Sequence, residues 1–94
     1  MNTLPEKTMD IIVPVSKYDV ILVNVDSINK TKLMMLLRKP PPYPQLSQRN
    51  SAMVLGHMPS VIVRCVDLKD AVLLELLIEL AGGSVDIRRA KQCD

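Results

Sequence analysis

Residues 59–88 read PSVIVRCVDLKDAVLLELLIELAGGSVDIR and carry the clearest secondary-structure pattern in the chain. The β-branched residues 61–66 predict a strand, and the aliphatic run over residues 67–81 predicts a helix. The glycine pair at 82–83 ends that helix, because glycine readily adopts the backbone conformation that follows a helix. Residues 84–88 alternate between apolar and polar side chains, which is typical of a half-buried strand. This stretch therefore predicts a strand, a helix and a final strand.

The residues before this stretch predict one more strand and two more helices. Residues 18–26 are β-branched and partly alternating, so they predict a strand. Good helix formers at residues 32–39 continue a helix that Ser27 or Asn29 can cap. A second helix is expected from residue 48 to residue 55 or 57. The predicted order of elements is β-α-α-β-α-β.

Three local features carry further expectations. Ser47 is expected to cap the second helix, and Asp67 is expected to cap the third, with Asp70 completing a variant of the capping box. The proline-rich residues 40–44 are expected to form a stiff, extended linker that connects two helices; in the alternative, they are a proline-rich ligand for an aromatic-lined groove.

Length and composition exclude several classes of protein. The 94 residues predict one domain over residues 17–89, with a tail or accessory segment at 1–16 and a polar tail at 90–94. One His, two Cys and three Gly exclude most recurring catalytic and metal-binding motifs, so we expect no enzyme, no cofactor and no metal. The two Tyr are the sole aromatic residues, which argues against stacking platforms for single-stranded nucleic acid.

The cysteines and the N-terminal sequence predict a cytoplasmic protein. Cys65 is expected to be a small buried hydrophobe, and Cys93 a free surface thiol. The N-terminal residues lack the charged-then-apolar order of a signal peptide. The most apolar run, residues 71–82, is shorter than the roughly 20 residues of a membrane span.

The chain resembles the C-terminal domain of the bacterial ribosomal stalk protein over residues 17–89. The matching positions are Pro59, Val66, Ala71, Leu74, Ile78, Ala81, Gly82 and residues 85–88, with weaker likeness at 18–22 and 29–38. The resemblance implies an α+β fold, in which three helices cover one face of a three-stranded antiparallel sheet. It also implies a protein partner, since that family contacts translational GTPases through its first two helices. Lys30 and Arg38 are retained from that contact face, and Met34 replaces an isoleucine, whereas Met35 and Ala52 stand where lysines are expected.

A second resemblance, to the N-degron adaptor of the Clp protease, gives an alternative function. Residues 18–26 resemble the opening strand of that adaptor, and Val25 replaces the middle Asp of its Asn-Asp-Asp turn. His57 lies near the position of a His that helps to hold an N-terminal amine. The resemblance implies a substrate-binding site at Asn24, Asp26 and His57, whose oxygen acceptors would close on a cationic amine.

Charge is distributed unevenly along the chain. Residues 27–66 contain no Asp or Glu. The first two helices should therefore present a basic face, which favours an acidic protein surface as partner and makes sequence-specific nucleic-acid binding an unfavoured alternative. We assign to this basic face Lys30, Lys32, Met34, Arg38, Lys39 and Arg49.

The third helix has more apolar residues than a single core-facing stripe needs. Its core face is expected to hold Ala71, Leu74, Leu77, Ile78 and Ala81. Its outer face is expected to hold Val72, Leu73, Leu76 and Leu80. We expect this outer stripe to bind a protein partner or a second copy of the chain. In the alternative, the N-terminal residues 11–13 fold over it.

Overall fold

The computed structural model describes residues 16–93 and shows an α+β fold. Its elements, in chain order, are β1 (Tyr18–Val25), the short 3-10 helix η1 (Ser27–Asn29), α2 (Lys30–Leu37), α3 (Gln48–Gly56), β2 (Ser60–Val66), α4 (Leu68–Leu80) and β3 (Gly83–Arg89). Apart from η1, this is the predicted order. The predictions for residues 1–15, including a cover formed by residues 11–13, lie outside the described residues.

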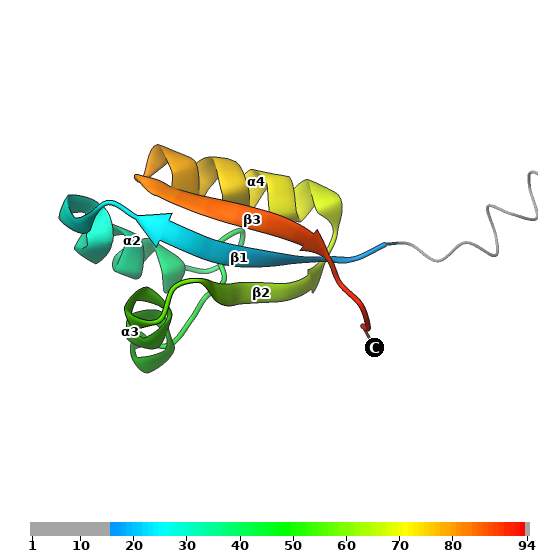
Figure 1. Ribbon diagram of the computed structural model, residues 1–94, viewed down its shortest axis with the longest axis horizontal. Helices are drawn as coiled ribbons and strands as arrows, with labels where there is room; N and C mark the ends of the chain where they lie inside the picture. The colour runs from blue at the N-terminus through cyan, green and yellow to red at the C-terminus, as the bar shows by residue number, and fades with distance from the viewer. Residues whose placement is uncertain (1–15, 94) are drawn as a thin grey trace, which may run out of the picture.

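The three strands form one antiparallel sheet in the order β2-β1-β3. Ile21 in the central strand lies opposite Val61 of β2 and opposite Asp86 of β3. Helices α2 and α4 lie behind the sheet in Figure 1, and α3 lies near the start of β2. The predicted arrangement, with the helices on one face of the sheet, is therefore confirmed.

The core lies between the sheet and the helices, and the central strand supplies its middle. Val20 and Leu22 are completely buried because alternate side chains of a strand point to the same face. An irregularity in the pairing of β1 with β3, between Leu22 and Asn24, brings Val25 to the same face. The helical side chains packed against these residues include Leu33, Leu37, Leu74 and Ile78.

Helix α4 buries its predicted core face, with one exception. Ala71, Leu74, Ile78 and Ala81 are buried as expected, whereas Leu77 is half-buried. Leu77 lies at the edge of the buried arc, because the sheet covers a narrower part of the helix than the sequence pattern suggested.

The predicted caps differ in outcome. Asn29 occupies the N-cap position of α2, but within residues 16–93 its side chain makes no cap hydrogen bond. The N–H of Asn50 donates to the hydroxyl of Ser47 at 3.0 Å, so the cap of α3 is confirmed. The predicted side-chain cap of α4 is wrong. Asp67 occupies the N-cap position, but within the described chain its side chain makes no cap hydrogen bond. Its carboxylate accepts instead from the ammonium of Lys17 at 2.6 Å.

The proline-rich loop is a turn, and the prediction of an extended linker is wrong. The N–H of Tyr43 donates to the carbonyl of Pro40 at 3.2 Å, and the N–H of Leu46 donates to the carbonyl of Leu37 at 2.8 Å. Both Tyr43 and Leu46 pack against the core. The chain therefore turns back at the end of α2. This turn lets Tyr43 and Leu46 bury apolar surface against the core, which an extended linker would leave exposed to solvent.

The cysteines form a Cys65–Cys93 disulfide with a Cα–Cα distance of 5.8 Å, so the predicted buried cysteine and free thiol are wrong. Strands β2 and β3 both run antiparallel to β1, so both end beside the start of β1. This topology brings Cys65 near the segment that follows β3. The N–H of Ala90 donates to the carbonyl of Lys17 at 2.8 Å, which directs that segment past the end of β2.

We predict that Cys93→Ser lowers the free energy of unfolding by about 3–4 kcal/mol, because it opens a loop of 28 residues. Urea denaturation of the oxidised wild type and of the variant measures the difference. Alkylation of the unreduced wild type should modify no thiol. Two alkylated cysteines in a sample with wild-type stability would contradict the disulfide.

We also predict that Gly82→Ala destabilises the fold by about 1–2 kcal/mol, because Gly82 has a φ of +93° and lies against the side chain of Asn29. Gly56→Ala is the matched control, since Gly56 ends α3 with no atom close to an added Cβ. It should leave stability unchanged or raise it slightly. Equal losses in the two variants, measured by urea denaturation, would show that the Gly82 turn has no special backbone requirement.

Candidate protein-binding surface

The outer face of α4 presents four large aliphatic side chains to solvent. Their exposed fractions are 39% for Val72, 42% for Leu73, 52% for Leu76 and 82% for Leu80. We refer to these four residues as the α4 stripe. They are exposed because the sheet covers α4 on one side and nothing in residues 16–93 covers the other.

Leu68 extends this apolar surface and was missed by the sequence reasoning. It is 48% exposed at the first position of α4. Its spacing of four residues from Val72 could have revealed it, since residues four apart lie on neighbouring turns of a helix.

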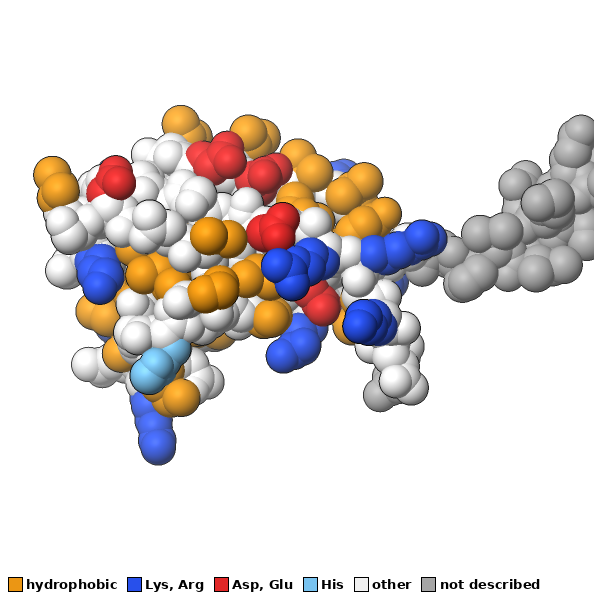
Figure 2. Space-filling model, in the orientation of Figure 1, with side chains coloured by type: hydrophobic (Ala, Val, Ile, Leu, Met, Phe, Trp, Pro, Cys, Tyr) orange, Lys and Arg blue, Asp and Glu red, His pale blue; other side chains and the backbone are white. Residues whose placement is uncertain are grey.

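Acidic side chains accompany the α4 stripe. Helix α4 carries Asp70, Glu75 and Glu79, with Lys69 as its single basic residue. Figure 2 shows hydrophobic and acidic side chains together over this helix. By helical spacing, Glu75 and Glu79 lie one turn apart on one flank of the stripe. By the same spacing, Lys69 lies one turn before Val72 and Leu73. The surface is therefore apolar from Val72 to Leu80, with one basic residue at its N-terminal end and negative charge along that flank.

The predicted basic face is divided between two hollows on the α2–α3 pair. Lys30 and Met34 line one hollow together with Ala52. Arg38 and Lys39 line another, at the turn that leads to α3. The remaining two residues of the prediction, Lys32 and Arg49, are exposed but line neither hollow.

The hollows on the α2–α3 pair, beside β2 and on the open face of the sheet do not bring together the three residues of the alternative adaptor site. Asn24 and Asp26 are exposed at the end of β1. His57 is exposed at the C-cap of α3 and lines a hollow with Met53 and Arg64, in which neither Asn24 nor Asp26 takes part. Asn24 and Asp26 therefore have no described hollow to share with His57.

A charge pair lies beside the start of α4. The ammonium of Lys17 and the carboxylate of Asp67 are 2.6 Å apart, and both side chains are substantially exposed. The hydrogen bond from Lys17, together with its positive charge, lowers the pKa of Asp67 below 3.8. The pair joins the entry of β1 to the entry of α4.

Two further features bear on function. Within residues 16–93, no group of three or more His, Cys, Asp or Glu side chains is placed to hold a metal ion. No helix in this part of the chain is long and apolar enough to cross a membrane.

No family model, curated protein or solved structure matches this chain. The resemblances to the stalk protein and to the adaptor therefore stay predictions.

We predict that the Lys17–Asp67 pair stabilises the fold at neutral pH and stops doing so in acid. A carboxylate with a depressed pKa contributes its stability above the unfolded pKa, near 3.8, and loses it as pH falls through the lower folded pKa. Lys17→Gln should therefore lower the urea midpoint at about pH 6 and leave it equal to that of the wild type at about pH 2. Lys32→Gln, which removes an exposed lysine on α2, controls for net charge. A deficit of the same size at both pH values would contradict the ion-pair effect.

Proposed function

We propose that this chain is a non-catalytic protein–protein interaction module that binds a protein partner through the α4 stripe. The observation that carries the proposal is the exposure of Val72, Leu73, Leu76 and Leu80 on one face of one helix. Burying an aliphatic side chain of this size contributes about 1.5–3 kcal/mol, so partly exposed ones still have much to gain. Exposed apolar patches of this kind mark interaction sites on small globular proteins.

The charge around the α4 stripe favours a different protein over a second copy of the chain. In an antiparallel pairing of two α4 helices about Leu76, equivalent flanks face each other, so Glu75 of one copy would lie close to Glu75 of the other. Like charges at such a position are destabilising. The partner that fits is an apolar surface with basic side chains at its rim.

The size of the surface also indicates the mode of binding. A helix of 13 residues is about 20 Å long, so the α4 stripe alone is smaller than a standard interface of about 800 Å² per partner. It suits a partner helix or groove of matching length. The basic residues of α2 and α3 would then meet an acidic part of the same partner, as a second region of contact.

The Cys65–Cys93 disulfide bears on the cellular compartment of the protein. The cytoplasmic location stays a prediction, and the Cys65–Cys93 disulfide is an observation against it, because disulfides are rare in cytosolic proteins. The adaptor function also stays a prediction. The hollow that His57 lines does not include Asn24 or Asp26, so it gives this function no support.

We predict that a synthetic amphipathic helix of about 18 residues, with leucines on one face and lysines on the other, binds the chain. Leu76→Glu should weaken this binding at least tenfold, about 1.4 kcal/mol, because it places a carboxylate at the centre of the α4 stripe. Fluorescence polarisation of the dye-labelled peptide measures the affinity. A peptide with the same leucines and with glutamates in place of the lysines should bind more weakly than the lysine peptide.

Met53→Glu is the matched control, because Met53 is 52% exposed, as Leu76 is, and lies on α3 instead of α4. It introduces the same charge and should leave binding of the lysine peptide within about twofold of the wild type. Urea denaturation verifies that both variants are folded. Equal losses in the two variants, or no binding of the lysine peptide to the wild type, would exclude the α4 stripe as the binding surface.

A further inference from the structure

The face of the sheet that points away from the helices has an apolar floor. Ile21, at the centre of this face, is only 8% exposed, yet it does not belong to the core cluster between the sheet and the helices. Val61 lies opposite it on β2. These two side chains form the floor of a hollow of about 520 Å³, a volume typical of sites for small organic molecules.

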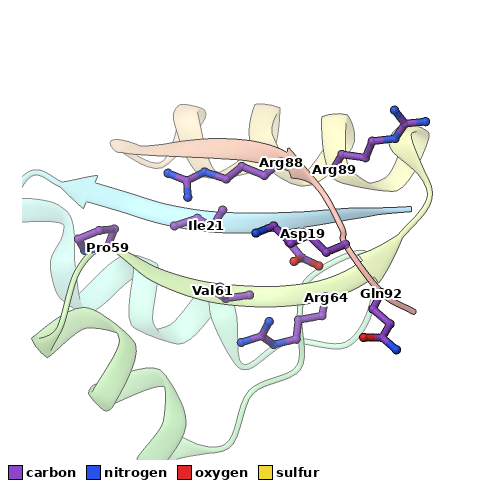
Figure 3. A pocket seen from close by; sticks show the side chains of 9 residues that line it. Asp19, Ile21, Pro59, Val61, Arg64, Arg88, Arg89 and Gln92 are labelled. Atoms are coloured by element: carbon purple, nitrogen blue, oxygen red, sulfur yellow. The ribbon is translucent and has the colours of Figure 1, made fainter. Parts of the chain in front are cut away.

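Two arginines border this floor. Figure 3 shows Arg88 of β3 and Arg64 of β2 on opposite sides of Ile21 and Val61, with both guanidinium groups directed toward Pro59. Among the described residues, Arg64 makes no ion pair. Arg88 uses its Nε to bond the carboxylate of Asp86 at 3.0 Å, which leaves its terminal amino groups for a ligand.

The other end of the hollow is closed by the segment that follows β3. Lys91 and Gln92 belong to the lining, and Figure 3 shows Gln92 across the hollow from Pro59. The Cys65–Cys93 disulfide fixes this segment to β2. Asp19, which also lines the hollow, accepts a hydrogen bond from the N–H of Cys65 at 3.0 Å, so its carboxylate already has a partner.

We propose that this hollow binds a small aliphatic carboxylate, with its hydrocarbon chain on Ile21 and Val61 and its carboxylate at the Pro59 end of the floor, toward which Arg64 and Arg88 direct their guanidinium groups. Guanidinium groups bind carboxylates through paired, charge-assisted hydrogen bonds. The site is independent of the proposed function, because it lies on the sheet face opposite α4.

The charges in the hollow favour a singly charged ligand. The lining carries Arg64, Arg88, Arg89 and Lys91, but Arg89 donates to the hydroxyl of Ser16 at 2.7 Å and points away from the floor in Figure 3. Asp19 lines the hollow and Asp86 pairs with Arg88, so these two carboxylates balance two of the three remaining positive charges. A phosphate dianion would need more uncompensated positive charge and would meet repulsion from these carboxylates. A monoanionic carboxylate fits the remaining charge, and the apolar floor requires a hydrocarbon part.

The experiment is an NMR titration of the full chain with sodium hexanoate, in which backbone amide shifts locate the binding site. Hexan-1-ol tests the need for the charge, and hexyl phosphate tests the choice of anion. Arg64→Gln and Arg88→Gln remove the two arginines one at a time. Lys69→Gln, on the exposed face of α4, is the charge-matched control, and Cys93→Ser releases the segment that closes the hollow.

We expect hexanoate to shift the amides around Ile21, Val61 and Arg88, and to bind more tightly than either other probe. Each arginine variant should weaken binding about threefold to tenfold, and Cys93→Ser should also weaken it, whereas Lys69→Gln should not. Shifts centred on α4 or on the α2–α3 pair would overturn the assignment. So would equal affinity for hexan-1-ol, tighter binding of hexyl phosphate, or arginine variants that bind like the wild type.

Discussion

The one-sided packing of β1 determines the rest of this structure. Val20, Leu22 and Val25 point to the same side of the sheet, and α2 and α4 are held there because they bury their apolar residues against that side. A sheet with helices on one face leaves two surfaces without an internal partner: the outer side of those helices and the open side of the sheet. Both surfaces carry side chains that the core does not bury: the exposed aliphatic residues of α4 on one, and the residues that line the hollow on the other.

The two surfaces differ in chemistry, and this difference separates their proposed roles. The outer side of α4 is aliphatic with an acidic flank, which suits a protein surface with a basic rim. The open side of the sheet is a hollow with an apolar floor between two arginines, which suits a small anion. The Cys65–Cys93 disulfide belongs to the second surface, because it fixes the segment that closes the hollow.

Local patterns in the sequence predicted the elements and much of the core, and contacts between distant residues account for the errors. The spacing of Ala71, Leu74 and Ile78 identified the buried face of α4. Because Leu76 and Leu80 do not lie on that face, the same pattern predicted that they are exposed. Lys17 is 50 residues from Asp67, so no local pattern could reveal that it takes the carboxylate expected to cap α4. The cysteine pairing likewise depends on where β2 and β3 end beside β1, and the hollow on the open sheet face depends on cross-strand register.

The most direct test of the α4 stripe as a surface for a different protein is the solution mass of the full chain. Light scattering over a range of concentrations, on the wild type and on Leu76→Glu, measures it. We predict a monomer of 10.5 kDa in both cases, because Glu75 and Glu79 oppose the pairing of two α4 helices. A wild-type dimer that Leu76→Glu converts to monomer would contradict this, since the α4 stripe would then be occupied by a second copy of the chain.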